Sequence, residues 1–269
     1  MKTLMLSIIN IAQQAGEKIL QCYRDTSTAV TYKADASPVT MADKLSHQLV
    51  CQALKQLTPN IPIISEEERV MPYVSEQALG ECYWLVDPLD GTKDFLAKNG
   101  EFTVNIALID KQVPQLGVIY VPVFDCSYFA EANGAAFKQN GRNTPQLLKT
   151  RDWEQSISPV MAISRRHGTA RLKNFFKQFP ALNLIRCGSA LKFCWMAEGY
   201  IDMDPRFAPT SQWDTAAGQC ILEAAGGRVF NRQGQSLGYK AGFSMLNEYF
   251  LAVGDKKYPY WHDYFSKIS

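Results

Sequence analysis

The sequence lacks the residue patterns of several common enzyme classes. None of its seven cysteines forms a CxxC pair, and its three histidines (His47, His167 and His262) have no metal-ligand spacing. This odd, dispersed set of thiols argues against a disulfide framework or a zinc site and predicts a reducing compartment, the cytoplasm. The chain has no GxxxxGK[ST] loop and no GxSxG elbow. P-loop chemistry is therefore excluded, and an α/β-hydrolase is disfavoured.

Strong net charge and long apolar runs are also missing. The 269 residues carry a formal net charge of +2, and the aromatic residues are not interleaved with basic runs, so no nucleic-acid surface is predicted. No apolar run is long enough to span a bilayer. The run 4–11 resembles the start of a signal peptide, but Gln13, Gln14, Glu17 and Lys18 interrupt it. The apolar residues share one helical face instead, which predicts an amphipathic helix packed on the domain.

The overall composition is ordinary for a globular enzyme, with 46% hydrophobic and 20% charged residues. Strand-like segments at 102–109 and 116–121, split by a loop at 110–115, and a hairpin turn at Asn133-Gly134 dominate the first half. Strands and helices alternate in the second half, with strands at 160–164, 183–186 and 200–203 and helices at 171–179, 189–198 and 214–225. We therefore predict an α+β lobe over residues 1–150 and an α/β lobe over residues 151–269.

The most informative segment runs from Trp84 to Phe95. An apolar strand end, Trp84–Val86, is followed by two carboxylates, Asp87 and Asp90, with a proline between them that predicts a turn. Gly91-Thr92 then opens a polar segment that can start a helix. Carboxylate oxygens suit hard cations and helix N-terminal amides suit phosphate. The segment thus predicts a place where metal ions meet a phosphate group.

Other acidic residues have similar settings, because each abuts an apolar element. These are Asp43 in the first turn of a helix predicted from Thr40 to Leu57, Glu66 after a short strand, and Asp214 at a helix start. The residues alone leave open whether they converge. Carboxylates gathered in one cleft would repel each other unless cations bind them, and two or three Mg²⁺ ions would relieve that repulsion. The alternative, a solvated acidic surface, fits Glu67 and Glu68 better.

Three segments carry a family resemblance. They are Asp87-Pro88-Leu89-Asp90-Gly91-Thr92, Trp213-Asp214-Thr215-Ala216-Ala217-Gly218 and Ser65-Glu66-Glu67. The first two resemble the signature motifs of the lithium-sensitive, Mg²⁺-dependent inositol monophosphatase superfamily, and the third resembles its acidic loop. The likeness extends from Lys33 to Gly227. It implies a layered αβαβα sandwich that combines α+β and α/β features.

Within that superfamily the chain is most similar to the bacterial 3'(2'),5'-bisphosphate nucleotidases, on the segments 33–40, 99–105, 188–194 and 205–214. This resemblance implies Mg²⁺-dependent hydrolysis of adenosine 3',5'-bisphosphate to AMP and phosphate, in connection with sulfate assimilation. It implies in-line attack by a metal-activated water without a phospho-enzyme. One departure is Ala97, which stands where a polar or basic residue is more usual. That position is outside the metal shell.

The resemblance also implies roles for individual residues. The metal ligands would be the side chains of Glu66, Asp87, Asp90 and Asp214 and the backbone carbonyl of Leu89. Asp43 and Thr92 would orient and deprotonate the water; their alternatives are a favourable charge in a helix first turn and a helix-capping hydroxyl. The amides of Gly91 and Thr92 would hold the scissile phosphate. The predicted substrate-binding set is Glu66, Leu89, Asp90, Gly91, Thr92, Ser164, His167, Ser189, Lys192, Arg206 and Asp214.

Substrate choice is expected to depend on the second lobe. A nucleotide bisphosphate has a non-reacting phosphate that needs cationic or amide donors, and Ser189, Lys192 and Arg206 are the main candidates. Arg165 and Arg166 are weaker candidates, since a single arginine is more often a solvated surface charge. His167 could bond to the nucleotide or serve as an ordinary loop histidine.

Two other functions stay open. One is an inositol or sugar monophosphatase of the same fold. The other is a non-catalytic metal- or nucleotide-binding protein, which the full set of acids and Thr92 disfavours. The expected partner is a small nucleotide. The sequence leaves open the number of ions, the oligomeric state and a peripheral association with the cytoplasmic face of the inner membrane.

Overall fold

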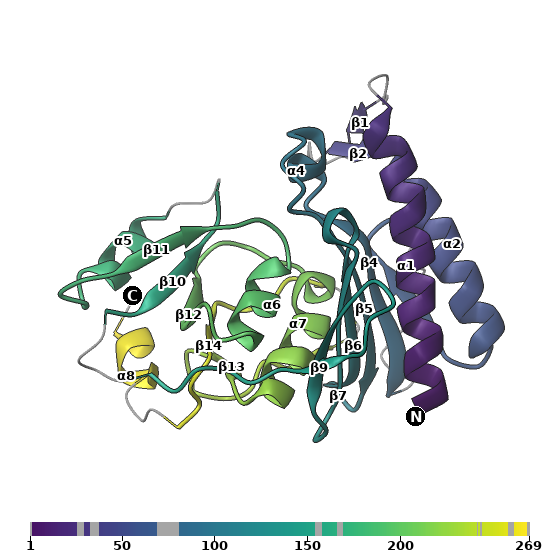
Figure 1. The fold of residues 1–269 in the computed structure, drawn as a ribbon. Helices are drawn as coiled ribbons and strands as arrows, with labels where there is room; N and C mark the ends of the chain where they lie inside the picture. The colour runs from purple at the N-terminus through teal and green to yellow at the C-terminus, as the bar shows by residue number, and fades with distance from the viewer. Residues whose placement is uncertain are drawn as a thin grey trace.

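The computed structural model describes residues 2–25, 30–32, 38–68, 81–153, 158–165, 169–240, 242, 244–257 and 261–267. Five layers follow one another across the molecule (Figure 1). Helices α1 (Lys2–Arg24) and α2 (Met41–Leu57) cover the outer face of a seven-stranded sheet. Helices α6 (Leu191–Ala197) and α7 (Gln212–Ala225) separate it from a five-stranded sheet, whose far face carries α5 (Ala170–Phe176) and α8 (Trp261–Ser266). The predicted αβαβα sandwich is confirmed.

The seven-stranded sheet has the order β3-β4-β5-β6-β7-β8-β9, and all its pairs except β3–β4 are antiparallel. Lys111 and Gln112, both with positive φ (48° and 67°), join β5 to β6 in a tight turn, so the predicted loop at 110–115 was too long. The hairpin at Asn133-Gly134 is confirmed. The strands are β3 (Ile63–Ser65), β4 (Cys82–Asp90), β5 (Thr103–Asp110), β6 (Val113–Val121), β7 (Cys126–Glu131), β8 (Ala136–Asn140) and β9 (Gln146–Leu147).

The five-stranded sheet has the order β11-β10-β12-β14-β13, with β10 parallel to both neighbours and β14 antiparallel to both of its own. A strand was predicted at 200–203, and this was wrong, because the pairing starts only at Met203 and runs to Arg206. The strands are β10 (Val160–Ile163), β11 (Asn183–Arg186), β12 (Met203–Arg206), β13 (Arg228–Asn231) and β14 (Phe250–Val253). The short elements β1 (Val30–Tyr32), β2 (Pro38–Thr40), α4 (Thr92–Leu96) and the 3-10 turn η1 (Pro122–Phe124) complete the described fold.

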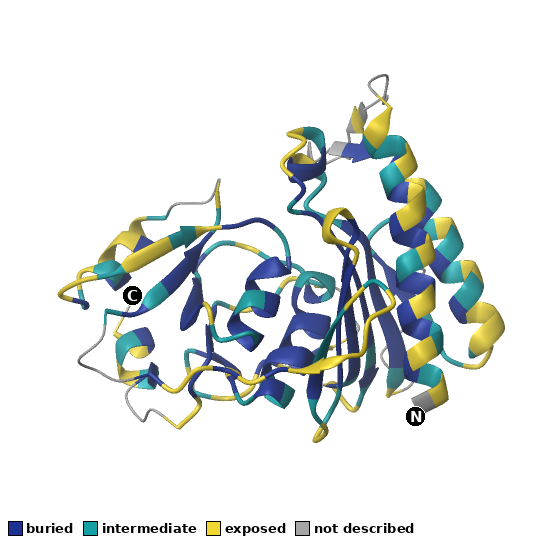
Figure 2. Cartoon of the chain, viewed as in Figure 1, coloured by how far each residue is buried: buried dark blue, intermediate teal, exposed yellow. Residues whose placement is uncertain are grey.

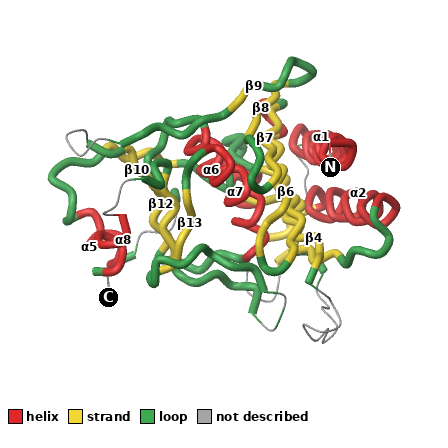
Figure 3. The backbone as a smooth tube through the Cα atoms, turned by 90° about the horizontal axis from the view of Figure 1, so that it is seen from below, coloured by secondary structure: helices red, strands yellow, loops and turns green. Residues whose placement is uncertain are grey.

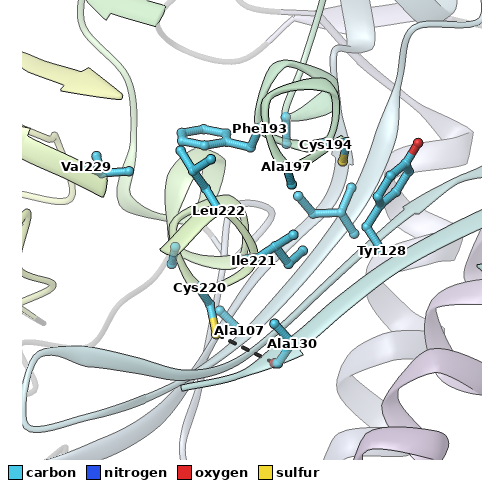
Figure 4. Packing of buried hydrophobic residues seen from close by; sticks show 14 of the residues in the cluster. Ala107, Tyr128, Ala130, Phe193, Cys194, Ala197, Cys220, Ile221, Leu222 and Val229 are labelled. Atoms are coloured by element: carbon cyan, nitrogen blue, oxygen red, sulfur yellow. Dashed lines mark hydrogen bonds between the residues drawn. The ribbon is translucent and has the colours of Figure 1, made fainter. Parts of the chain in front are cut away.

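Helix α7 holds the two sheets together. It is buried on nearly every side, and it lies between the sheets in two perpendicular views (Figures 2 and 3). Small residues bring it close to the first sheet, since a Cβ on Gly117 would lie 2.6 Å from the carbonyl oxygen of Ala217. Ala107, Ala130, Cys220 and Ile221 fill this interface (Figure 4). The tight packing of α7 fixes Asp214, at its N-terminal end, relative to the strand that carries Asp87.

Helix α1 is amphipathic as predicted. Its buried face, with Ile8, Ala12, Ala15 and Ile19, packs on the first sheet, and the opposite face is exposed (Figure 2). In the described part of the chain no helix combines the length and apolar character needed to cross a membrane. The lobe boundary near residue 150 stays a prediction.

Candidate active site

A β-bulge places the two motif carboxylates on the same side of β4. Asp87 pairs with Asn105, but Asp90 pairs with Thr103, so β4 has one residue more than β5 between these pairs. In a regular strand, residues three apart point to opposite faces; the extra residue brings the side chains of Asp87 and Asp90 together. The turn predicted at Pro88 was wrong. The strand continues to Asp90, and the proline, which has no N–H for the ladder, sits in the bulge.

The carboxylates of Asp87, Asp90 and Asp214 converge. Each offers an oxygen atom that lies within 4.8 Å of the other two. Asp214 is the third residue of α7, where its Oδ2 accepts a hydrogen bond of 2.8 Å from the Ser211 N–H in a capping box. Glu66 extends the β3–β4 pairing, since its N–H donates to the Val86 carbonyl at 3.1 Å. We call Glu66, Asp87, Asp90 and Asp214 the acidic wall.

The electrostatics of the acidic wall favour bound cations. Burial, together with the charges of Asp90 and Glu66, raises the pKa of Asp214 to about 8. Burial also raises the pKa of Asp87, and Glu66 and Asp90 add to the effect. Carboxylate oxygens at this spacing are the donor set that Mg²⁺ prefers, and bound cations would restore the ionised forms. The residues present therefore fit a magnesium centre, with the Leu89 carbonyl beside them at 3.4 Å from the Thr92 hydroxyl.

Asp43 and Thr92 form a hydrogen-bonded pair next to this wall. The Thr92 hydroxyl donates to Oδ1 of Asp43 at 3.0 Å, while Oδ2 accepts from the Thr40 N–H and hydroxyl at 2.7 and 2.6 Å. Thr40 is the N-cap of α2, as predicted. Burial raises the pKa of Asp43 to about 6, against the opposing effect of these bonds. Because the Thr92 hydroxyl donates its proton to Asp43, the lone pairs of its oxygen are left to accept a hydrogen bond from a water.

Gly91 is the N-cap of α4, so the alternative interpretation of Thr92 as a capping hydroxyl does not hold. The φ of Gly91 is +89°, a left-handed conformation that favours glycine. A Cβ there would lie 3.1 Å from the carbonyl oxygen of Glu101 and 3.3 Å from the Cβ of Ser189. Gly91 is thus packed closely between the loop before β5 and the turn before α6.

Two cations line the same pocket as the acidic wall: Lys192, which is buried, and Arg206, which is partly buried; we call them the cationic wall. Lys192 is 2% exposed, and its Nζ donates to the Ser189 carbonyl at 3.1 Å. Burial and the nearby Arg206 lower the pKa of Lys192. Arg206 lies on β12, where its Nε donates to Oδ2 of Asp204 at 2.9 Å. Although burial opposes it, Asp204 raises the pKa of Arg206, so that this side chain stays charged.

A pocket of about 240 Å³ lies between the two walls. Nine of the predicted site residues line it, namely Glu66, Asp90, Gly91, Thr92, Ser164, Ser189, Lys192, Arg206 and Asp214. Asp43, Asp87 and Leu89 are buried and do not line the pocket. His167 and Arg166 lie outside the described residues, as do residues 33–37 of the segment 33–40.

Sequence reasoning missed several contacts of this site. Asp204, which holds Arg206, is two residues away on the same strand, and this spacing in the sequence could have indicated the pair. Asn105 donates to Oδ2 of Asp90 at 3.3 Å, and the Ala190 N–H donates to the same oxygen at 2.6 Å. Those two contacts join distant parts of the chain and have no local signal. Glu101, in the segment 99–105, was given no role.

Comparison with known proteins agrees with this geometry. The profile described as "Inositol monophosphatase family" matches residues 2–262. The chain belongs to the inositol monophosphatase family. It is 44% identical to the 3'(2'),5'-bisphosphate nucleotidase CysQ of Escherichia coli K12 over 241 residues, which are 89% of this chain and 95% of that protein. It is 31% identical to the CysQ of Haemophilus influenzae, with 97% of this chain and 96% of that protein covered.

Solved structures of the family superpose well on the chain. The crystal structure of CysQ from Bacteroides thetaiotaomicron gives a TM-score of 0.81 at 36% identity, covering 94% of this chain and 98% of that one. An inositol monophosphatase from Anabaena gives 0.73 at 23% identity, covering 99% of this chain and 94% of that one. At such low identity the second likeness concerns the fold alone. The layered sandwich is thus shared by a CysQ and by an inositol monophosphatase.

Proposed function

We propose that the protein is a Mg²⁺-dependent 3'(2'),5'-bisphosphate nucleotidase that converts adenosine 3',5'-bisphosphate to AMP and phosphate. The observation that carries this proposal is the pairing of two walls in one pocket, an acidic one and a cationic one. A reacting phosphate with its metal ions fits the acidic wall. A second, non-reacting phosphate fits Lys192 and Arg206. The CysQ relatives support the same substrate.

Five residues would form the metal centre. Glu66, Asp87, Asp90, Asp214 and the Leu89 carbonyl would hold two or three Mg²⁺ ions. When bound, these ions supply a more acidic water and charge stabilisation for the leaving oxygen.

Around that centre the protein itself would position the reactants. Asp43 fixes the Thr92 hydroxyl at 3.0 Å, and the Thr92 oxygen would accept a hydrogen bond from the attacking water, so that a lone pair of that water faces phosphorus. As the water attacks, its proton would pass to the Thr92 oxygen while the Thr92 proton passes to the Asp43 carboxylate, which is the net proton acceptor. The N–H groups of Gly91 and Thr92, at the start of a short helix, would bond the phosphate oxygens. A location in the cytoplasm and an association with the inner-membrane face stay predictions, as does the oligomeric state.

A second family function is less well supported. An inositol or sugar monophosphate has one phosphate, so it would offer Lys192 and Arg206 no second anionic group to bind. A non-catalytic binding protein would have no need for the Asp43–Thr92 pair.

Phosphate release from adenosine 3',5'-bisphosphate and from inositol 1-phosphate, each with Mg²⁺, tests the proposal. We expect the nucleotide to have the larger kcat/KM and a chelator to abolish both activities. Equal or faster hydrolysis of the inositol phosphate would contradict the assignment of the nucleotide as substrate. Turnover that persists after exhaustive chelation would contradict the metal dependence.

A further inference from the structure

The turn Gly188-Ser189-Ala190, which leads into α6, is held at both ends by carboxylates of the first sheet. The Gly188 N–H donates to Oε2 of Glu101 at 2.8 Å, and the Ala190 N–H donates to Oδ2 of Asp90 at 2.6 Å. Ser189 between them has a φ of +46°, a left-handed conformation uncommon for a residue with a side chain. The turn packs closely, since a Cβ on Gly188 would lie 2.5 Å from Oδ2 of Asp94. Glu101 therefore helps to fix one edge of the pocket.

The same carboxylate also holds Arg165. The guanidinium makes a bidentate pair with Glu101, with Nε at 2.8 Å from Oε2 and a second N–H on Oε1. Arg165 follows β10, and it lines the pocket with its side chain 40% exposed. Glu101 comes from the loop before β5. The pair thus joins the two sheets at the pocket, and both oxygens of Glu101 are engaged by the second sheet's loops.

A guanidinium has five N–H donors, and Glu101 engages two of them. The remaining donors belong to a planar group whose orientation is fixed, so little rotamer entropy is lost when an anion binds to it. Phosphate oxygens match such a fork. Carboxylate and guanidinium cancel each other's charge at the rim, so the pair by itself attracts no anion at long range; its contribution comes from geometry.

We infer that Glu101 is a positioning residue that holds Arg165 at the rim of the pocket, where Arg165 binds the non-reacting phosphate and so distinguishes bisphosphate from monophosphate substrates. This inference rests on the proposed function. It adds to Lys192 and Arg206 a third cation, at the rim, whose position is set by a residue of the loop before β5. Arg165 acts on substrate binding, while the acidic wall and Thr92 act on the chemical step.

The test compares adenosine 3',5'-bisphosphate with adenosine 3'-monophosphate, which has the same scissile phosphate and lacks the other. Arg165→Lys keeps the charge and loses the fork, and Glu101→Gln removes the charge that holds it while keeping an oxygen for the Gly188 N–H. For both variants we expect KM for the bisphosphate to rise about tenfold, equivalent to about 1.4 kcal/mol, with kcat within about a factor of two. KM for the monophosphate should stay unchanged.

Arg151→Lys is the matched control. Arg151 makes a similar bidentate pair with Asp202 and is 43% exposed, but Asp202 contacts the Val160 end of β10, opposite the Arg165 end. This variant should leave both KM values unchanged. Equal effects of Arg165→Lys on the two substrates, or no effect on either, would overturn the inference. If the wild type hydrolyses the two nucleotides and inositol 1-phosphate with the same kcat/KM, the proposed function is wrong whatever the variants show.

Discussion

The acidic wall and the cationic wall line one pocket, yet they differ in how their charges are balanced. On the cationic side the protein provides the counter-charge, because Asp204 bonds Arg206 at 2.9 Å and stays within the same strand. On the acidic side three carboxylates lie with oxygens within 4.8 Å of one another, and burial raises the pKa of Asp214 to about 8. Arg206 thus has its counter-charge before substrate arrives, whereas the acidic wall needs cations from solution.

The two walls also differ in how they are built. The acidic wall depends on a bulge in β4 and on the cap of α7, both of which are buried parts of the central layers. The cationic wall depends on a strand of the second sheet and on the short helix α6. Both walls are therefore attached to well-packed elements, since nearly all of α6 and most of β12 are buried as well. They differ in that Asp87 and Asp90 come from the first sheet, whereas Arg206 comes from the second.

Removing one charge from the acidic wall should have the largest effect. Asp90→Asn keeps the shape of the side chain and an acceptor for the Ala190 N–H, but it removes a ligand charge. We expect kcat/KM for the bisphosphate to fall at least about a thousandfold, as loss of several kcal/mol of charge stabilisation implies. The metal-free protein should melt at the same temperature or higher, since the variant relieves repulsion.

The comparison with Asp263→Asn, a change of an exposed carboxylate on α8, separates this effect from a general loss of charge. That control should retain full activity. An Asp90→Asn protein with near-normal turnover would show that Asp90 is not part of the metal centre.

Removing one charge from the cationic wall should have a smaller and more selective effect. Lys192→Met keeps most of the volume of this 2% exposed side chain and removes its ammonium group. A hydrogen bond to a charged group is worth about 1.5–3 kcal/mol, so we expect a rise of about 10- to 100-fold in KM for the bisphosphate. Adenosine 3'-monophosphate should be affected far less.

Lys173→Met, on the exposed side of α5, is the matched control and should change neither KM. If Lys192→Met instead lowered kcat equally for both nucleotides, the side chain would serve the chemical step, and the division between the two walls would be wrong.

The sequence singled out the individual carboxylates of the acidic wall, because their signals are local and their motifs resemble those of a known family, but it left open whether they converge. The run of apolar residues before Asp87, the capping position of Asp214 and the first-turn position of Asp43 all follow from short-range rules. The bulge was not predictable, since register is a property of two strands and appears only when β4 pairs with β5. The contact of Glu101 with Arg165 joins residues 64 positions apart, and it depends on how the two sheets face each other.

Glu223 on α7 provides the test with the smallest expected effect, because it is a partly buried carboxylate outside the acidic wall. Burial raises the pKa of Glu223 from 4.5 to about 6, while its Oε1 accepts from the Val229 N–H at 3.3 Å. The folded state therefore binds more protons than the unfolded state between these pH values. The contribution of Glu223 to the free energy of unfolding should fall by about 2 kcal/mol as pH rises from 4.5 to 6 and then stay level.

Glu223→Gln, which keeps an acceptor for Val229, should remove that slope and stabilise the protein by about 1–2 kcal/mol at pH 7, with no gain at pH 4. Urea unfolding at several pH values measures the effect, and phosphatase activity should not change. A variant that is less stable than the wild type at pH 7 would contradict the prediction. Mg²⁺ should raise the free energy of unfolding of the wild type and of Glu223→Gln equally, and that of Asp90→Asn much less. Urea unfolding with and without Mg²⁺ therefore distinguishes Glu223, whose charge burial only destabilises, from Asp90, whose charge binds a cation.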